Sequence, residues 1–144
     1  MSPFLLDVNV LIALLHKDHV SYKIVRHWFQ RSGAKDWVTC PLTEASFVRI
    51  VSNPKFSDPS LDISEALEML HIVSKLPGHR FWAMDVGFVD AVEPFAERLF
   101  GHQQVTDAYL LGMAVKKKGK LVTLDRAIKA LAGSEFRDHV LLLE

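Results

Sequence analysis

Residues 4–15 of the chain read FLLDVNVLIALL, and this stretch decides the fold class. A short β-prone apolar run ends at Asp7, and the apolar residues 10–15 that follow have the composition of a helix start. The same change from a short apolar run to a helical pattern recurs further along the chain. Short strands that alternate with longer helices are typical of βαβ units in a parallel sheet. The sequence therefore predicts an α/β fold.

The expected elements alternate along the whole chain. The predicted architecture is a three-layer α/β/α sandwich with a mainly parallel central sheet. A loop with two prolines is expected at residues 54–62. Short apolar runs predict strands at residues 4–7, 37–40, 80–84, 120–124 and 140–143. Helical signals predict helices at residues 10–15, 20–30, 64–76, 94–99 and 126–131, a helix that Thr43 caps and that runs through Val51, and a helix that Thr106 caps.

Length and composition favour one domain that spans residues 1–144. Of the 144 residues, 49% are hydrophobic, and a chain of this length buries roughly 70% of its unfolded surface. The 17 basic and 17 acidic residues cancel, so the overall charge indicates neither a nucleic-acid nor a membrane partner. The single cysteine, Cys40, lies in an expected strand, where inert core packing is the usual role. Any binding to a polyanion would depend on local basic patches.

The N-terminal segment does not have the pattern of a secretion signal. No basic segment precedes its first apolar run, and Asp7 interrupts that run. The apolar residues 10–15 are far fewer than the roughly 20 that span a membrane. We therefore expect a cytoplasmic protein that makes no contact with a membrane.

Four acidic residues lie where an apolar stretch gives way to a helix start or a turn. Asp7 and Asp125 each follow an expected strand, while Glu44 and Asp107 lie in the first turns of expected helices. In a parallel sheet all strand ends of one polarity open onto one edge, so these carboxylates are expected to meet there. Close carboxylates repel one another, and bound cations relieve that repulsion. The four acids therefore predict metal-dependent phosphate chemistry.

Helix capping also explains each acid when it is considered alone. Carboxylates are favoured in a first helical turn by the unpaired N–H groups and the helix dipole. Capping does not explain why all four acids are expected at the same edge of the sheet. The two interpretations are compatible, because a helix N-terminus keeps a carboxylate ionised and a hard cation requires that state. Mg²⁺ takes such oxygen ligands together with water and substrate phosphate oxygens.

Polar residues beside the acids are candidates for orienting them. Asn9 follows Asp7 by two positions, and its amide would hold a ligand carboxylate or a water. A local turn hydrogen bond is the alternative role for Asn9. Thr106 and Thr123 precede acids and are candidate hydrogen-bond donors to the site, although Thr106 is equally expected as a helix N-cap.

Basic residues provide candidates for contacts with a phosphate. Arg126 follows Asp125 directly, and Arg49 is a candidate at the rim of the pocket. The lysines at residues 116–118 form the densest basic run, and cations are favoured at a helix C-terminus. They come roughly ten residues after Asp107, about 15 Å away at the helical rise, so we place them at the opposite edge of the sheet.

Two histidines have a spacing that also occurs in metal sites. His16 and His19 lie three positions apart after the first helix. Without nearby Cys or further His partners, metal binding is not the favoured role. We expect these side chains to face RNA or to order the loop.

Four segments taken together resemble the PIN-domain family. The resemblance covers essentially the whole chain and is closest to the VapC-type toxins, the ribonuclease half of bacterial toxin–antitoxin pairs. It departs from some members of the family, which carry a further acid shortly after the position of Asp125. The segments read LLDVNVLIAL at residues 5–14, TEA at 43–45, TDAYL at 106–110 and TLDR at 123–126.

The resemblance implies a function and a set of partners. The activity would be hydrolysis of RNA phosphodiester bonds that depends on Mg²⁺, with Mn²⁺ as the expected substitute. The family also implies inhibition by a cognate antitoxin protein and a homodimer, for which Trp82 and its neighbours are a candidate surface. The implied metal-binding and catalytic residues are Asp7, Glu44, Asp107 and Asp125.

Two other functions remain alternatives at this point. A haloacid-dehalogenase-like phosphatase also carries a nucleophilic aspartate at a strand end, but it needs a second aspartate two residues on. Asn9 occupies that position here and cannot donate the proton. A receiver or interaction domain would keep an acidic pocket without turnover. Such a domain normally has two adjacent acids at the first strand end, where this chain has only Asp7.

Overall fold

Residues 2–56 and 60–144, the part of the chain that the computed structural model describes, fold around a five-stranded sheet. All four pairs of neighbouring strands are parallel, and the strand order is β3-β2-β1-β4-β5. This confirms the predicted sheet. The strands are β1 (Phe4–Leu6), β2 (Trp37–Thr39), β3 (His79–Phe81), β4 (Lys120–Thr123) and β5 (Val140–Leu142).

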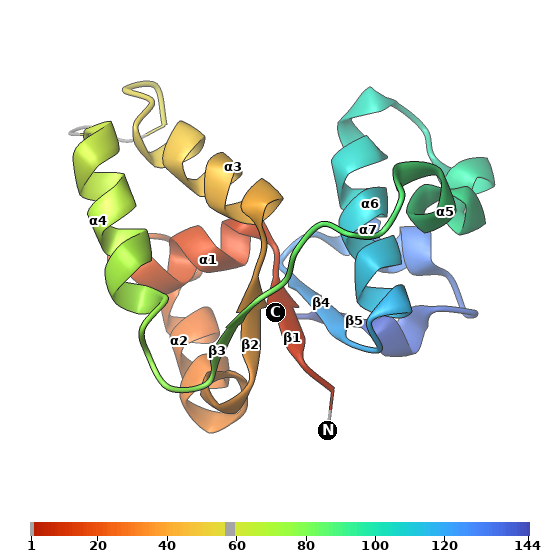
Figure 1. Cartoon of the computed structure of the whole chain (residues 1–144), viewed down its shortest axis with the longest axis horizontal. Coiled ribbons are helices and arrows are strands. Elements are labelled where there is room, and N and C mark those ends of the chain that lie inside the picture. Colours follow the sequence, from red (N-terminus) through yellow and green to blue (C-terminus); the bar gives the residue numbers. More distant parts are fainter. Residues whose placement is uncertain (1, 57–59) are drawn as a thin grey trace.

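Helices cover both faces of the sheet, which confirms the predicted three-layer arrangement (Figure 1). The first four helices pack on one face over a buried core that includes Leu6, Trp37 and Phe47. The last three pack on the other face over a core that includes Phe95 and Leu111. The helices are α1 (Val8–Leu15), α2 (Tyr22–Arg31), α3 (Pro41–Val51), α4 (Ile63–Val73), α5 (Phe88–Val92), α6 (Val105–Lys116) and α7 (Arg126–Ala132), and short 3₁₀ turns lie at Gly33–Lys35, Glu93–Arg98, His102–Gln104 and Arg137–His139.

The strand order places one point of the sheet at the centre of the fold. From β1 the chain moves outward to β2 and β3, and it then returns to the other side of β1 to form β4 and β5. The order therefore reverses between β1 and β4. In open α/β sheets, ligands bind outside the carboxyl ends of the strands at such a switch point.

A close helix contact helps to fix where α6 begins. A Cβ atom added at Gly112 would lie 2.0 Å from the carbonyl oxygen of Ala91, so only glycine allows α5 to lie this near to α6. Residues 108–114 of α6 are all buried. This packing fixes the axis of α6, whose first turn carries Asp107 toward the switch point.

Several predicted helix starts are wrong by a few residues. The helix expected at residues 10–15 begins at Val8, directly after Asp7. Cys40, not Thr43, is the N-cap of α3, and Thr43 instead accepts the backbone N–H of Cys40 from the third helical position. Thr106 does not cap α6 either, because the helix begins at Val105 after the 3₁₀ turn at His102–Gln104.

Two further differences concern the middle of the chain. The sequence pattern does not predict α5, and the helix predicted at residues 94–99 is a 3₁₀ segment at Glu93–Arg98. The loop predicted at residues 54–62 includes 57–59, which lie outside the described residues. Within the described part, none of the helices has both the length and the apolar character to cross a membrane.

Candidate active site

Asp7 is a buried carboxylate at the carboxyl end of the central strand. It is the N-cap of α1, and Oδ1 accepts the backbone N–H of Val8 at 2.8 Å. Oδ2 accepts the hydroxyl of Thr123 at 2.9 Å, and the side chain is only 4% exposed. Desolvation by burial raises the pKa of Asp7, and the charge of Asp125 adds to this, while the hydrogen bonds from Thr123 and Val8 lower it.

Thr123 joins two of the predicted acids across neighbouring strands. Its hydroxyl donates to Asp7 and accepts the backbone N–H of Asp125 at 3.0 Å. Asp125 itself is the N-cap of α7 and accepts the N–H of Ala127 at 2.9 Å. The sequence predicts Thr123 as a hydrogen-bond donor to the site, and in the structure its hydroxyl donates to Asp7, at the end of the neighbouring strand.

Asp107 reaches the same place from the first turn of α6. Desolvation, followed by the negative charges of Asp7 and Asp125, raises the pKa of Asp107 to about 7. The three aspartates are therefore close enough for their charges to act on one another. They come from the ends of β1 and β4 and from the start of α6, which all meet at the switch point.

Glu44 has a different set of neighbours. It lies in the first turn of α3, and its Oε2 accepts the hydroxyl of Thr39 at 2.6 Å. Nε2 of His79 lies 2.8 Å from the same hydroxyl oxygen. Desolvation lowers the pKa of His79, while the Ser74 carbonyl and the charge of Glu44 raise it. The fourth predicted acid is thus held by the hydroxyl of Thr39 at the end of β2.

The three aspartates have the chemistry of a site for a divalent cation. Their oxygens are hard ligands, and burial, followed by the charges of Asp7 and Asp125, raises the pKa of Asp107. As the side chains stand, no group of three or more His, Cys, Asp or Glu residues within 2–56 and 60–144 is arranged to hold a metal ion. The donor set fits such an ion in chemistry, and binding would require these side chains to converge.

The other predicted site residues lie at the surface around the acids. Asn9 and Thr106 are exposed in the first turns of α1 and α6. Arg49 is exposed in the last turn of α3. Arg126 is exposed beside Asp125 and forms a 2.9 Å ion pair with Glu144.

The histidines and lysines singled out in the sequence have local partners. Nδ1 of His16 accepts the backbone N–H of Asp18 at 3.2 Å, and Nδ1 of His19 accepts that of Ser21 at 3.0 Å. These bonds agree with the loop-ordering role. In the lysine run at the end of α6, Lys117 pairs with Asp85 at 2.7 Å.

Thr39 and His79 are two site residues that sequence reasoning missed. The available signal was a polar residue at the end of a buried strand, since Thr39 closes β2 as Thr123 closes β4. Thr39 donates its hydroxyl to Glu44, and Thr123 donates its hydroxyl to Asp7. His79 carried no comparable signal, because it precedes its expected strand and gains its role only from the pairing of β2 with β3.

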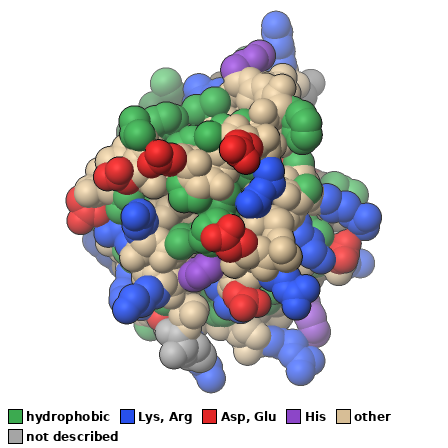
Figure 2. All heavy atoms as spheres, turned by 90° about the vertical axis from the view of Figure 1, so that its right-hand side faces the viewer, with side chains coloured by type: hydrophobic (Ala, Val, Ile, Leu, Met, Phe, Trp, Pro, Cys, Tyr) green, Lys and Arg blue, Asp and Glu red, His purple; other side chains and the backbone are tan. Residues whose placement is uncertain are grey.

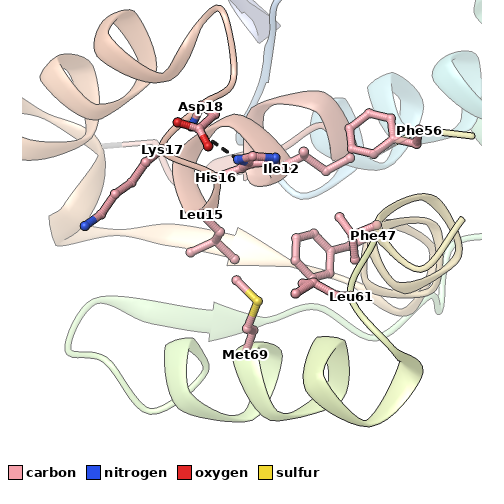
Figure 3. Close-up of a pocket in the computed structure, with 10 residues that line it drawn as sticks. Ile12, Leu15, His16, Lys17, Asp18, Phe47, Phe56, Leu61 and Met69 are labelled. Atoms are coloured by element: carbon pink, nitrogen blue, oxygen red, sulfur yellow. Dashed lines mark hydrogen bonds between the residues drawn. The ribbon is translucent and has the colours of Figure 1, made fainter. Parts of the chain in front are cut away.

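A cavity of about 530 Å³ lies away from the acids, between α1, α3 and α4. Figure 3 shows the side chains of Leu15, Phe47, Leu61 and Met69 pointing toward one another into this space. His16 lies at its rim with the Asp18 backbone bond marked. The lining is mainly apolar, which suits an apolar partner better than a nucleotide.

Charges are mixed on the side of the molecule shown in Figure 2. Acidic and basic side chains alternate there among apolar patches, without a continuous basic stripe. This agrees with the net charge of +0. A polyanion on this side would meet local contacts rather than a uniformly positive surface.

Comparison with known proteins gives a consistent set of matches. A family model described as PIN domain matches residues 4–134. Ribonuclease VapC38 of Mycobacterium tuberculosis is 41% identical over 139 residues, which cover 96% of each chain. Ribonuclease VapC44 of the same species is 38% identical over 128 residues, which cover 89% of each. The solved structure of VapBC2 from Rickettsia felis bound to a DNA fragment from their promoter matches 98% of each chain with a TM-score of 0.61 and 12% identity, so it supports the fold alone.

Proposed function

Because the chain belongs to the PIN domain family, we propose that it is an endoribonuclease that hydrolyses RNA phosphodiester bonds with a bound divalent cation. The observation that carries the proposal is the gathering of Asp7, Asp107 and Asp125 at the switch point, where burial, followed by the charges of Asp7 and Asp125, raises the pKa of Asp107 to about 7. Membership of this family leaves the phosphatase and receiver alternatives without a supporting observation.

Each of the four acids has a distinct part in the proposed site. Asp7 is pre-oriented by Thr123 and by the N-terminus of α1, so its carboxylate would be an anchor for the cation. Asp107 and Asp125 would complete that set, and Glu44 would join it from the start of α3. We propose Mg²⁺ as the cation, with Mn²⁺ able to replace it, because carboxylate oxygens suit both ions.

The cation and the protein would divide the work of hydrolysis. When bound, a divalent cation supplies Lewis-acid activation of the phosphodiester and of water. The protein holds Asp7 in place before substrate arrives, through the Val8 N–H and the Thr123 hydroxyl, which avoids the cost of ordering this acid during the reaction. Arg126 is exposed beside Asp125 and Arg49 is exposed in the last turn of α3, and we propose that each contacts an RNA phosphate.

The proposed partner is a cognate antitoxin protein, with the cavity between α1, α3 and α4 as its docking site. The apolar lining suits an amphipathic helix, which binds through its apolar face in such grooves. Changing Met69 to Asp would place a charge among these apolar side chains. We expect M69D to lose copurification with a co-expressed antitoxin and to retain RNA cleavage.

We also propose that the protein is a homodimer. Trp82, the centre of the predicted dimer surface, is buried, but its neighbours Phe81, Met84, Phe88 and Val89 are between 40% and 70% exposed. Such a run of exposed apolar side chains is typical of an interaction surface. A V89E variant should sediment as a monomer where the wild-type protein sediments as a dimer.

One assay tests the proposed activity. The purified protein, free of antitoxin, would be incubated with structured RNAs in Mg²⁺, in Mn²⁺ and in EDTA, beside the D107N variant. We expect cleavage in either metal, and none in EDTA or with D107N. Cleavage that persists in EDTA would overturn the metal-carboxylate mechanism, and phosphate release from a monoester without RNA scission would point to a phosphatase.

A further inference from the structure

A row of hydrogen-bonding groups runs from Glu44 through Thr39 to His79. Oε2 of Glu44 accepts the Thr39 hydroxyl at 2.6 Å, and Nε2 of His79 lies 2.8 Å from that hydroxyl oxygen. On its other side, Nδ1 of His79 lies 3.1 Å from the carbonyl oxygen of Ser74. Two segments distant in the sequence, residues 39–44 and 74–79, thereby meet beside one carboxylate.

The Thr39 hydroxyl is committed to Glu44. A hydroxyl has one hydrogen, and a carboxylate is the strongest acceptor within its reach. The distance of 2.6 Å lies in the range of a charge-assisted O–H···O⁻ bond. Thr39 is only 2% exposed, so little water competes for either group. This bond therefore restricts the rotamer of Glu44 and leaves the second carboxylate oxygen for another partner.

His79 is itself held firmly beside Thr39. Its ring packs against the ring of Trp37, with the two centroids 4.6 Å apart. The Ser74 carbonyl can only accept a hydrogen, so Nδ1 of the ring donates to it. A neutral ring that donates from Nδ1 has no hydrogen on Nε2, so Nε2 lies beside the Thr39 oxygen without donating to it. Trp37 pairs with His79 in the register of β2 and β3, so the contact between their rings follows from the strand pairing.

We propose that Thr39 is a positioning residue for Glu44. Thr39 fixes the carboxylate through its hydroxyl, and the His79 ring lies beside Thr39. This inference rests on the proposed function, in which Glu44 contributes to cation binding. Groups that hydrogen-bond a metal-binding carboxylate orient it, and losing one typically lowers metal affinity by about 10–100-fold.

A threonine at a strand end donates its hydroxyl to an acid at two places in the sheet, which supports the inference. At the end of β4, the buried Thr123 donates to Asp7 at 2.9 Å, and at the end of β2 the buried Thr39 donates to Glu44. The two strands lie on either side of β1. A threonine at each flanking strand end thus orients one acid of the proposed site.

The test measures Mn²⁺ binding to the purified full-length protein without RNA, by calorimetry and by the loss of the free Mn²⁺ signal in electron paramagnetic resonance. T39V removes the hydroxyl at nearly constant shape, and T39S restores it. H79F keeps a ring against Trp37 but removes both nitrogens. S52A is the matched control, because the Ser52 hydroxyl donates only to the Val48 carbonyl at the far end of α3.

We expect T39V to bind Mn²⁺ about 10–100-fold more weakly than the wild type. T39S and S52A should bind like the wild type, and so should H79F, because the Thr39 hydroxyl and its bond to Glu44 remain in that variant. In an E44Q background, T39V should have no further effect, because Thr39 acts through the Glu44 carboxylate. A residue with a merely structural role would instead lower the affinity equally in both backgrounds.

Other outcomes separate this inference from the proposed function. If T39V binds Mn²⁺ as tightly as the wild type, or more tightly, Thr39 does not position Glu44 for the cation. A similar loss in both backgrounds also overturns the inference. If T39V does not fold in a thermal melt, T39A decides, since that variant also lacks the hydroxyl and unchanged affinity in it contradicts the positioning role. A wild-type protein that neither binds Mn²⁺ nor cleaves RNA would refute the proposed function itself.

Discussion

The hydroxyl of Thr123 donates a 2.9 Å hydrogen bond to Oδ2 of Asp7, although the two residues are 116 positions apart. The register of β1 and β4 brings them together, because Leu6 pairs with Val122. Asp7 directly follows Leu6, and Thr123 directly follows Val122. Both side chains are buried. The central acid of the proposed site is thus fixed by a neighbouring strand before any ligand arrives.

Removing the Thr123 hydroxyl should destabilise the fold. In T123V the Oδ2 atom of Asp7 would be buried without that donor, and leaving a buried group unsatisfied costs about 1–3 kcal/mol. We expect a loss of this size in the free energy of unfolding, measured by urea denaturation at pH 7. T123S, which keeps a hydroxyl, should lose less. Equal stability of T123V and the wild type would show that the bond contributes nothing to the fold.

The pKa of Asp107 predicts how stability depends on pH. Folding raises it from its ordinary value of 3.8 to about 7, so the folded state binds this proton more tightly than the unfolded state. The stability that the proton provides is complete below about pH 4 and is lost as the pH rises through about 7. D107N cannot ionise, so its melting temperature should exceed that of the metal-free wild type increasingly from pH 5 to pH 8, by a few degrees.

A surface variant controls for general effects of charge. Asp138 is an exposed aspartate in the 3₁₀ turn at Arg137–His139. The difference in melting temperature between D138N and the wild type should stay constant across the same pH range. If the D107N difference also stays constant, Asp107 does not ionise near neutral pH in the folded protein.

A divalent cation should stabilise the wild-type protein by mass action. A ligand that binds only the folded state adds about 2.7 kcal/mol when its concentration is 100 times the dissociation constant. We therefore expect Mg²⁺ or Mn²⁺ to raise the melting temperature of the wild type, and EDTA to reverse the increase. D107N should show little of this response. An equal increase in both proteins would mean that the cation binds elsewhere.

Asp125 allows capping and metal binding to be separated. Its Oδ1 accepts the N–H of Ala127 at the start of α7. Asparagine caps helices about as well as aspartate, so D125N should keep wild-type stability, whereas D125A should lose about 1 kcal/mol. If the charge of Asp125 serves the reaction, RNA cleavage by D125N should fall on the order of 10²-fold. Full cleavage by D125N would leave capping as the role of Asp125.

Much of the fold could be predicted because its signals are local. Four of the five strands are short, mainly apolar runs, and every predicted strand overlaps a strand of the structure. The strand predicted at residues 80–84 is less accurate, because β3 begins at His79 and ends at Phe81. Helix starts were harder, because a threonine in the first turn resembles a cap. Thr43 bonds back to Cys40 from the third position, and Pro41 begins the helix earlier. α5 was missed because Phe88–Val92 is too short for a helical period to show.

The sequence by itself determined that acids follow the strands of a parallel sheet, and hence that carboxylates gather at one edge. Only the tertiary structure decided which groups bind those acids. The Thr123 hydroxyl donates to Asp7 rather than to its neighbour Asp125. Glu44 accepts the hydroxyl of Thr39, and Nε2 of His79 lies beside that hydroxyl. The physical reason is that side-chain partners across a sheet depend on strand order and register, which long-range packing sets. Strand ends are a local property of the chain, but the hydrogen bonds that orient a carboxylate there are not.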